Sequence, residues 1–88
     1  MMINENKFIF KKDVSPLKQL REKLGLTREQ FAVALGTTGS TIYRWETGVH
    51  TMSLTVTQFK KLVILIEPLG LGVHDLPDDF GPPESHKS

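Results

Sequence analysis

The chain has 88 residues. A single domain of this size buries only about 60% of its unfolded surface, which excludes a large enzyme architecture. The net charge is +1, but residues 1–48 hold eight Lys or Arg against five Asp or Glu, and residues 49–88 hold three against five. A polyanionic partner is therefore expected to meet the first half of the chain.

The sequence also argues against disulfides, thiolate chemistry and a membrane span. It contains no cysteine, and its longest uninterrupted apolar run, residues 62–66, is far shorter than the roughly 20 residues that cross a bilayer. The N-terminus, MMINENKFIF, carries an acid and lacks the long apolar segment of a secretory signal. The expected location is the cytoplasm, without membrane association.

The first predicted helix follows an N-terminal arm, residues 1–14, which is interpreted as either a short strand or a disordered segment. Ser15 followed by Pro16 is typical of a helix start, with Ser as the N-cap and Pro in the first turn. Gly25 supplies the stop. One face of this helix collects Leu17, Leu20 and Leu24.

Two more helix starts follow in close succession. Thr27 and Gln30 have the spacing of a capping box, and Gly36 ends the helix that they open. Thr38 is the predicted N-cap of the next helix, which Gly48 closes. The buried sides of these two helices are predicted to hold Phe31, Ala32, Leu35, Ile42 and Trp45.

A fourth helix is predicted from Thr55, which forms another capping box with Gln58, to the residue before Pro68. Its core side is expected to contain Val56, Phe59, Leu62, Val63 and Ile66. A short element is expected over residues 71–76. Residues 77–88 are Pro-rich and acidic and are predicted to form a flexible tail.

The segment TGSTIYRWETG, residues 38–48, separates into two sides at helical periodicity. Trp45 falls with Ile42 on the core side, so a structural role is favoured over a binding role. The outward side holds Ser40, Tyr43, Arg44 and Thr47. Glu46 lies at the margin of the buried side, where an unpaired carboxylate is costly, and Arg21 flanks the leucine face of the first helix. We predict an ion pair between Arg21 and Glu46; the alternative is that both reach solvent separately.

Two short helices joined by Gly36 and Thr37 describe a helix-turn-helix. The stretch LTREQFAVALGTTGSTIYRWETG resembles that of the Cro and lambda-repressor-like (XRE-like) regulators. The matching elements are Leu26-Thr27, Ala32, Leu35-Gly36, Ser40-Thr41-Ile42, Trp45-Glu46 and Gly48. The resemblance implies an all-α fold, a small bundle of four to five short helices, for a domain assigned to residues 15–76.

The resemblance also implies roles for individual residues. Residues 38–47 correspond to the recognition helix that enters the major groove, and its base-contacting set is Gly39, Ser40, Tyr43 and Arg44. A bidentate contact of Arg44 with guanine is worth about 1–3 kcal/mol of discrimination; the alternative is a phosphate contact. The implied phosphate-contacting residues are Arg28, Thr38, Thr47, His50 and Thr51.

The chain departs from the family pattern where DNA contacts are concerned. Gly39 stands where relatives carry a long polar side chain, and Thr47 and Val49 stand where lysine or arginine is common. This chain is therefore expected to neutralise fewer DNA phosphates than its relatives do, and to bind DNA with lower affinity. Readout of DNA shape, a partner protein, and the arm residues Lys7, Lys11 and Lys12 all remain open as compensation.

A dimer face is predicted beyond the core side of the fourth helix. Ile64 and Leu65 fall outside the core arc, and Leu69 and Leu71 follow them. These four residues are expected to form a homodimer interface that spaces two recognition helices about 34 Å apart, or to be covered by the chain that follows.

No enzyme chemistry, cofactor or metal is expected. Gly70 and Gly72 are not followed by the third glycine of a dinucleotide-binding site. The histidine and acidic residues among residues 74–79 are interpreted as a solvated tail and not as a metal site. The expected function is sequence-specific regulation of transcription by a homodimer on near-palindromic double-stranded DNA. The alternative is an antitoxin that also masks a toxin, or an adaptor that binds protein only.

Overall fold

The computed structural model describes residues 10–11 and 13–82. Four α-helices follow in chain order: α1 (Pro16–Lys23), α2 (Arg28–Leu35), α3 (Gly39–Thr47) and α4 (Val56–Ile66). Two short 3₁₀ helices complete the described chain, η1 (Glu67–Leu69) and η2 (Val73–Asp75). The described residues contain no strand, so the expected all-α bundle is confirmed.

The predicted helix starts are confirmed by their hydrogen bonds. The Ser15 hydroxyl accepts from the Lys18 N–H at 3.4 Å. Thr27 and Gln30 form a complete capping box at the start of α2, and Thr55 and Gln58 form another at the start of α4. In both boxes the threonine hydroxyl accepts from a backbone N–H at 3.1 Å and the glutamine oxygen accepts from the threonine N–H at 2.9 Å.

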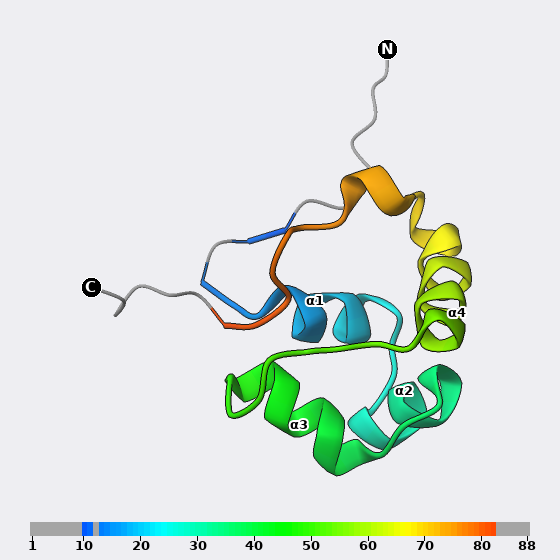
Figure 1. Ribbon diagram of the computed structural model, residues 1–88. Helices are drawn as coiled ribbons and strands as arrows, with labels where there is room; N and C mark the ends of the chain where they lie inside the picture. Colours follow the sequence, from blue (N-terminus) through cyan, green and yellow to red (C-terminus); the bar gives the residue numbers. More distant parts are fainter. Residues whose placement is uncertain (1–9, 12, 83–88) are drawn as a thin grey trace.

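Two glycines end the helices of the helix-turn-helix in left-handed backbone geometry. Gly36 has φ 92° and Gly48 has φ 84°, values that a residue with a β-carbon adopts only with strain. Gly36 turns the chain out of α2 and allows α3 to begin three residues later. The two helices pack against each other, with α3 running across the lower edge of the bundle (Figure 1).

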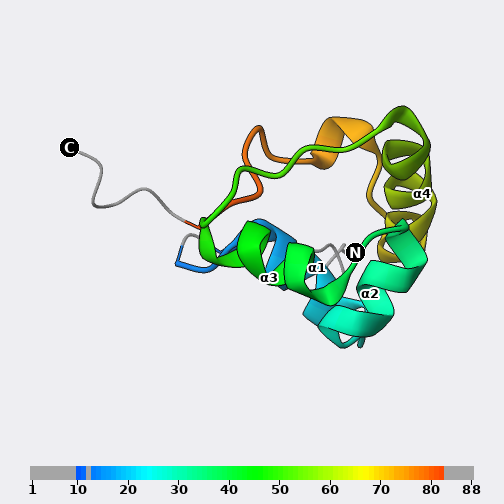
Figure 2. The same ribbon diagram turned by 60° about the horizontal axis from the view of Figure 1, so that its bottom comes forward.

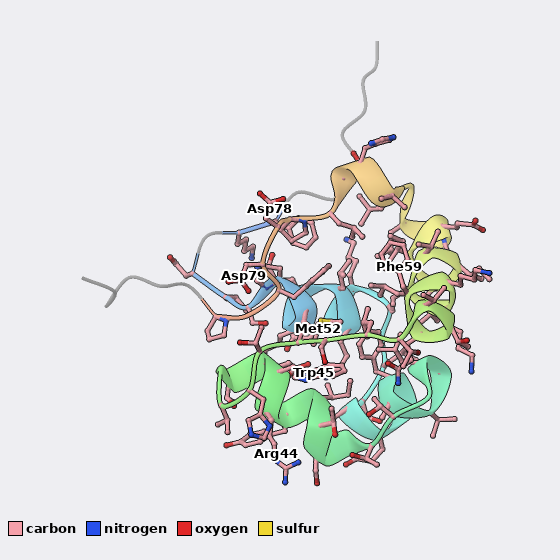
Figure 3. The ribbon with its side chains drawn as sticks, viewed as in Figure 1. Arg44, Trp45, Met52, Phe59, Asp78 and Asp79 are labelled. Atoms are coloured by element: carbon pink, nitrogen blue, oxygen red, sulfur yellow. The ribbon has the colours of Figure 1, made fainter. Side chains whose placement is uncertain are left out.

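The core lies between the four helices. Trp45 is 7% exposed and points from α3 into the molecule, beneath Met52 of the connecting loop (Figure 3). The other buried apolar side chains are Leu17, Leu20, Phe31, Ala32, Leu35, Ile42, Leu62, Ile66 and Leu71.

The predicted core side of α4 is wrong at its N-terminal end. Val56 is 72% exposed, and Phe59 lies on the inner side of the helix but remains 39% exposed (Figure 3). Only the C-terminal half of α4, around Leu62 and Ile66, is covered by the other helices. Periodicity identified a continuous apolar side, but Val56 in the first turn is left exposed by the rest of the described chain.

The C-terminal segment returns to the beginning of α1, as the two views of the ribbon agree (Figures 1 and 2). The Phe80 carbonyl accepts from the Ser15 hydroxyl at 2.8 Å and from the Leu17 N–H at 3.4 Å, and the Phe80 ring packs against the core. Residues 77–82 are therefore docked, where a flexible tail was expected. Residues 83–88 of that predicted tail lie outside the described residues.

The end of the N-terminal arm is also fixed to α1. Gln19, which is 8% exposed, donates through Nε2 to the carbonyls of Lys11 and Val14 at 2.9 and 2.7 Å, and its Oε1 accepts from the Lys11 N–H at 2.7 Å. The rest of the arm, with Lys7 and Lys12, lies outside the described residues. In the part of the chain that is described, no helix is long and apolar enough to span a membrane.

Candidate nucleic-acid interface

Glu46 is a buried carboxylate that ties three helices together. Its side chain is only 1% exposed, and the predicted ion pair with Arg21 is present: Arg21 Nε donates to Oε2 at 2.6 Å and Nη2 donates to Oε1 at 3.2 Å. Arg28 of α2 also donates, from Nε to Oε1 at 3.1 Å. The three charge-assisted hydrogen bonds hold α3 rigidly against α1 and α2.

Arg28 was expected to contact phosphate, and its place in this cluster was not anticipated from the sequence. Its side chain is 38% exposed, and its guanidinium carbon lies 5.0 Å from the centre of the Tyr43 ring. This stacking is a cation–π contact between α2 and α3. Arg28 and Tyr43 lie in different helices, so no local spacing signals the pair. A guanidinium has five N–H donors, and those of Arg28 that face solvent remain available to a phosphate.

The predicted base-contacting residues gather on one outer face of α3. They line a shallow hollow of about 460 Å³ together with two residues from the start of α2 and one from the loop after α3; the full set is Gly39, Ser40, Tyr43, Arg44, Arg28, Glu29 and Val49. The Arg44 side chain extends away from the bundle, and its guanidinium makes no hydrogen bond or ion pair with another described residue (Figure 3). This arginine is therefore available to an external acceptor.

Two of the predicted phosphate contacts have hydroxyls that are already engaged. Thr38 Oγ1 accepts from the Thr41 N–H at 3.2 Å as the N-cap of α3 and lies 3.1 Å from the Thr41 hydroxyl. Thr47 Oγ1 donates to the Tyr43 carbonyl at 2.8 Å. Both hydroxyls stabilise α3 itself, which lowers their capacity to donate to a phosphate.

The remaining predicted phosphate contacts, His50 and Thr51, lie in the loop that follows the C-terminal end of α3. His50 and Thr51 line a hollow of about 190 Å³ with Thr47, and Asp79 and Pro82 of the docked C-terminal segment complete one wall of it. The candidate phosphate contacts thus fall at both ends of α3, with the base-contacting set between them. Asp79 adds negative charge at this end, which opposes a phosphate.

The predicted dimer residues are split by the structure. Ile64 is 64% exposed, whereas Leu65 and Leu69 are partly buried against the core. Leu71 is only 5% exposed and belongs to the core, so its assignment to a dimer face is wrong. The chain turns back after η1, and this turn carries Leu71 underneath instead of leaving it on the surface.

No group of three or more metal-ligating side chains occurs among residues 10–11 and 13–82. Two of the acidic residues in the described C-terminal segment accept hydrogen bonds within local turns. Asp75 Oδ2 accepts from the Gly72 N–H at 2.9 Å, and Asp79 Oδ1 accepts from the Gly81 N–H at 2.8 Å.

Comparison with known proteins agrees with this geometry. A family model described as helix-turn-helix matches residues 17–69, which span α1 to η1 and are more than half of the chain. No similar curated protein and no similar solved structure was found. The matched region contains the Glu46 cluster and the whole outer face of α3.

Proposed function

Because the chain belongs to the XRE/lambda-repressor-like helix-turn-helix family, whose members are DNA-binding regulators, we propose that it recognises specific DNA sequences and regulates transcription. In this proposal α3 enters the major groove of double-stranded DNA in the cytoplasm. Ser40, Tyr43 and Arg44 face the base edges, and Gly39 lets the helix approach closely.

The observation that carries the proposal is Arg44. It is an exposed guanidinium without a partner among the described residues, on a helix that the Glu46 cluster holds in place. A guanidinium offers paired donors that match guanine O6 and N7. Arg28, Thr38, Thr47, His50 and Thr51 supply the proposed phosphate contacts, with Arg28 the strongest donor of the five.

The proposal is tested by selecting binding sites from random duplex DNA with the purified protein. We expect an enriched inverted repeat with guanine at a fixed position of each half-site. In Arg44→Ala the preference for that guanine should fall by about 1–3 kcal/mol. Lys23→Ala, which removes an exposed positive charge from the last turn of α1, is the matched control and should retain the preference. An unaltered guanine preference in Arg44→Ala would reject the role of Arg44.

We further propose that the regulator acts as a homodimer through the apolar surface of α4. Val56 and Ile64 are 72% and 64% exposed, and their spacing with the half-buried Val63 puts all three on one side of the helix. A second copy packed there would cover them. Two copies on one near-palindromic site would place their recognition helices about 34 Å apart.

The second candidate function is an antitoxin or adaptor that depends on a protein partner. The observation in its favour is the sparse positive charge near α3: two threonine hydroxyls are engaged within the helix, and Glu29 and Asp79 line the two hollows. Such a protein would bind DNA weakly when alone. Absence of any enriched sequence, with only weak and steeply salt-dependent binding, would favour this candidate.

A further inference from the structure

Gly39 is the first residue of α3, and its backbone conformation does not require glycine. The glycines with positive φ among the described residues are Gly25, Gly36, Gly48 and Gly70, so the backbone of Gly39 accommodates a side chain. The obstacle is a neighbour. A β-carbon on Gly39 would lie 2.8 Å from Oε2 of Glu29 and 3.2 Å from its Cδ. The Glu29 carboxylate thus occupies the space into which a side chain of residue 39 would project.

No hydrogen bond or ion pair holds the Glu29 carboxylate to another described residue. Glu29 is exposed in the first turn of α2, where an acidic side chain is common, and its backbone takes part only in the helix itself. It lines the same hollow as Ser40 and Arg44. A carboxylate on a surface that meets DNA is repelled by phosphates, but it can accept a hydrogen bond from a donor on a base edge.

We propose that Glu29 reads a cytosine in the DNA site, accepting a hydrogen bond from its exocyclic N4 amino group. The inference rests on the proposed function, in which α3 lies in the major groove. Glu29 thereby supplies from α2 the polar arm that Gly39 lacks. Gly39 is the residue that gives this arm its room.

The chemistry of the major groove selects cytosine among the four bases. Guanine and thymine present only acceptors there, and these repel a carboxylate. Adenine presents one donor beside the N7 acceptor, which opposes the second carboxylate oxygen. Cytosine presents its N4 donor without a neighbouring acceptor. Arg44 offers donors only, so Glu29 and Arg44 are complementary readers of the two members of G·C pairs.

Glu29 also lies near the N-termini of α2 and α3, where a carboxylate stabilises the helix dipoles. That effect is the same whatever DNA is bound. Base preference at a single position therefore separates a reading role from a structural one.

The experiment compares sites selected from random duplex DNA by wild-type protein, Glu29→Gln, Glu29→Asp and the control Glu67→Gln. Glu67 begins η1 on the side of the molecule away from α3, and its substitution makes the same change in charge (Figure 1). Wild type and Glu67→Gln should both prefer cytosine at one half-site position. Glu29→Gln should lose that preference by about tenfold and shift toward adenine, whose N6 and N7 match an amide.

Glu29→Asp keeps the charge but withdraws the carboxylate by one methylene, so it should also lose the preference by about tenfold. Because Glu29 is exposed and unpartnered within the described chain, these variants should fold, which circular dichroism checks. A cytosine preference unchanged in both Glu29 variants would overturn this inference while leaving the proposed function intact. Failure of wild-type protein to enrich any sequence would overturn both.

Discussion

At the scale of single residues, Glu46 holds the recognition helix through two arginines with different surroundings. Arg21 is nearly buried, with 11% of its side chain exposed, and Arg28 is 38% exposed. Removing one partner of a buried ion pair strands the other charge in a medium where it is poorly solvated. Water can substitute for a lost donor at the Arg28 side more readily than at the Arg21 side.

The two arginines are therefore predicted to contribute unequally to stability. Arg21→Met should lower the free energy of unfolding by about 3 kcal/mol, and Arg28→Met by about 1 kcal/mol or less. In a domain of this size the first change corresponds to a fall in Tm of at least about 12 °C. Thermal unfolding followed by circular dichroism measures both, with the exposed Lys23→Met as the control. Equal losses of unfolding free energy in Arg21→Met and Arg28→Met would show that the different burial of the two arginines does not determine their contribution to stability.

At the scale of elements, Gln58 connects α4 to the end of α2, a contact that lies outside the helix-turn-helix formed by α2 and α3. Its Oε1 completes the capping box of α4 by accepting from the Thr55 N–H, and its Nε2 donates to the Gly36 carbonyl at 3.1 Å. Gly36 is the first residue of the turn between α2 and α3. One side chain thus caps α4 and fixes the turn that positions the recognition helix.

Glutamate in place of Gln58 separates these two tasks. Gln58→Glu retains the acceptor for the capping box but cannot donate to Gly36, so it should lower the free energy of unfolding by about 0.5–1.5 kcal/mol at pH 7. The matched control is Gln30→Glu, which alters the same position of the other capping box, where the glutamine Nε2 donates to no other described residue. That variant should stay within about 0.5 kcal/mol of wild type, because a negative charge suits the first turn of a helix. Urea unfolding measures both, and similar losses in the two variants would refute the tie to Gly36.

At the scale of the whole molecule, the proposed dimer is the property on which recognition of a palindromic site depends. The candidate surface is the part of α4 that carries Val56 and Ile64, and the described chain leaves it uncovered. Leu65 and Leu69 pack against the core and are unsuitable for a test, because their substitution would also disturb the fold.

Ile64→Glu is predicted to convert the dimer into a folded monomer. A charged side chain buried in the proposed interface would lose its hydration, so association should fail, while the fold is retained because residue 64 is exposed in the single chain. Val33→Glu is the matched control, since Val33 is also an exposed apolar residue, at 80%, but lies on α2. Sedimentation equilibrium should give a monomer for Ile64→Glu, a dimer for Val33→Glu, and weaker binding of the monomer to a complete palindrome. A dimer in both variants would place the interface elsewhere.

The local course of the chain was predictable from the sequence by itself. The starts of α1, α2 and α4 depend on hydrogen bonds between residues three apart, and Gly36 and Gly48 end helices through their own backbone freedom. The pairing of Arg21 with Glu46 was also predictable, because periodicity puts both charges at the edge of an apolar face and a buried carboxylate needs a partner.

Only the tertiary structure decided the contacts between segments that are distant in sequence. Arg28 joining Glu46, Gln58 reaching Gly36, Phe80 docking on Ser15 and Glu29 filling the space beside Gly39 all depend on how separate elements approach each other. Helical periodicity shows which residues share a side, but it carries no information on whether another element covers that side. For this reason Val56 is exposed against expectation, and Leu71 is buried, which was one of the two alternatives that the sequence left open.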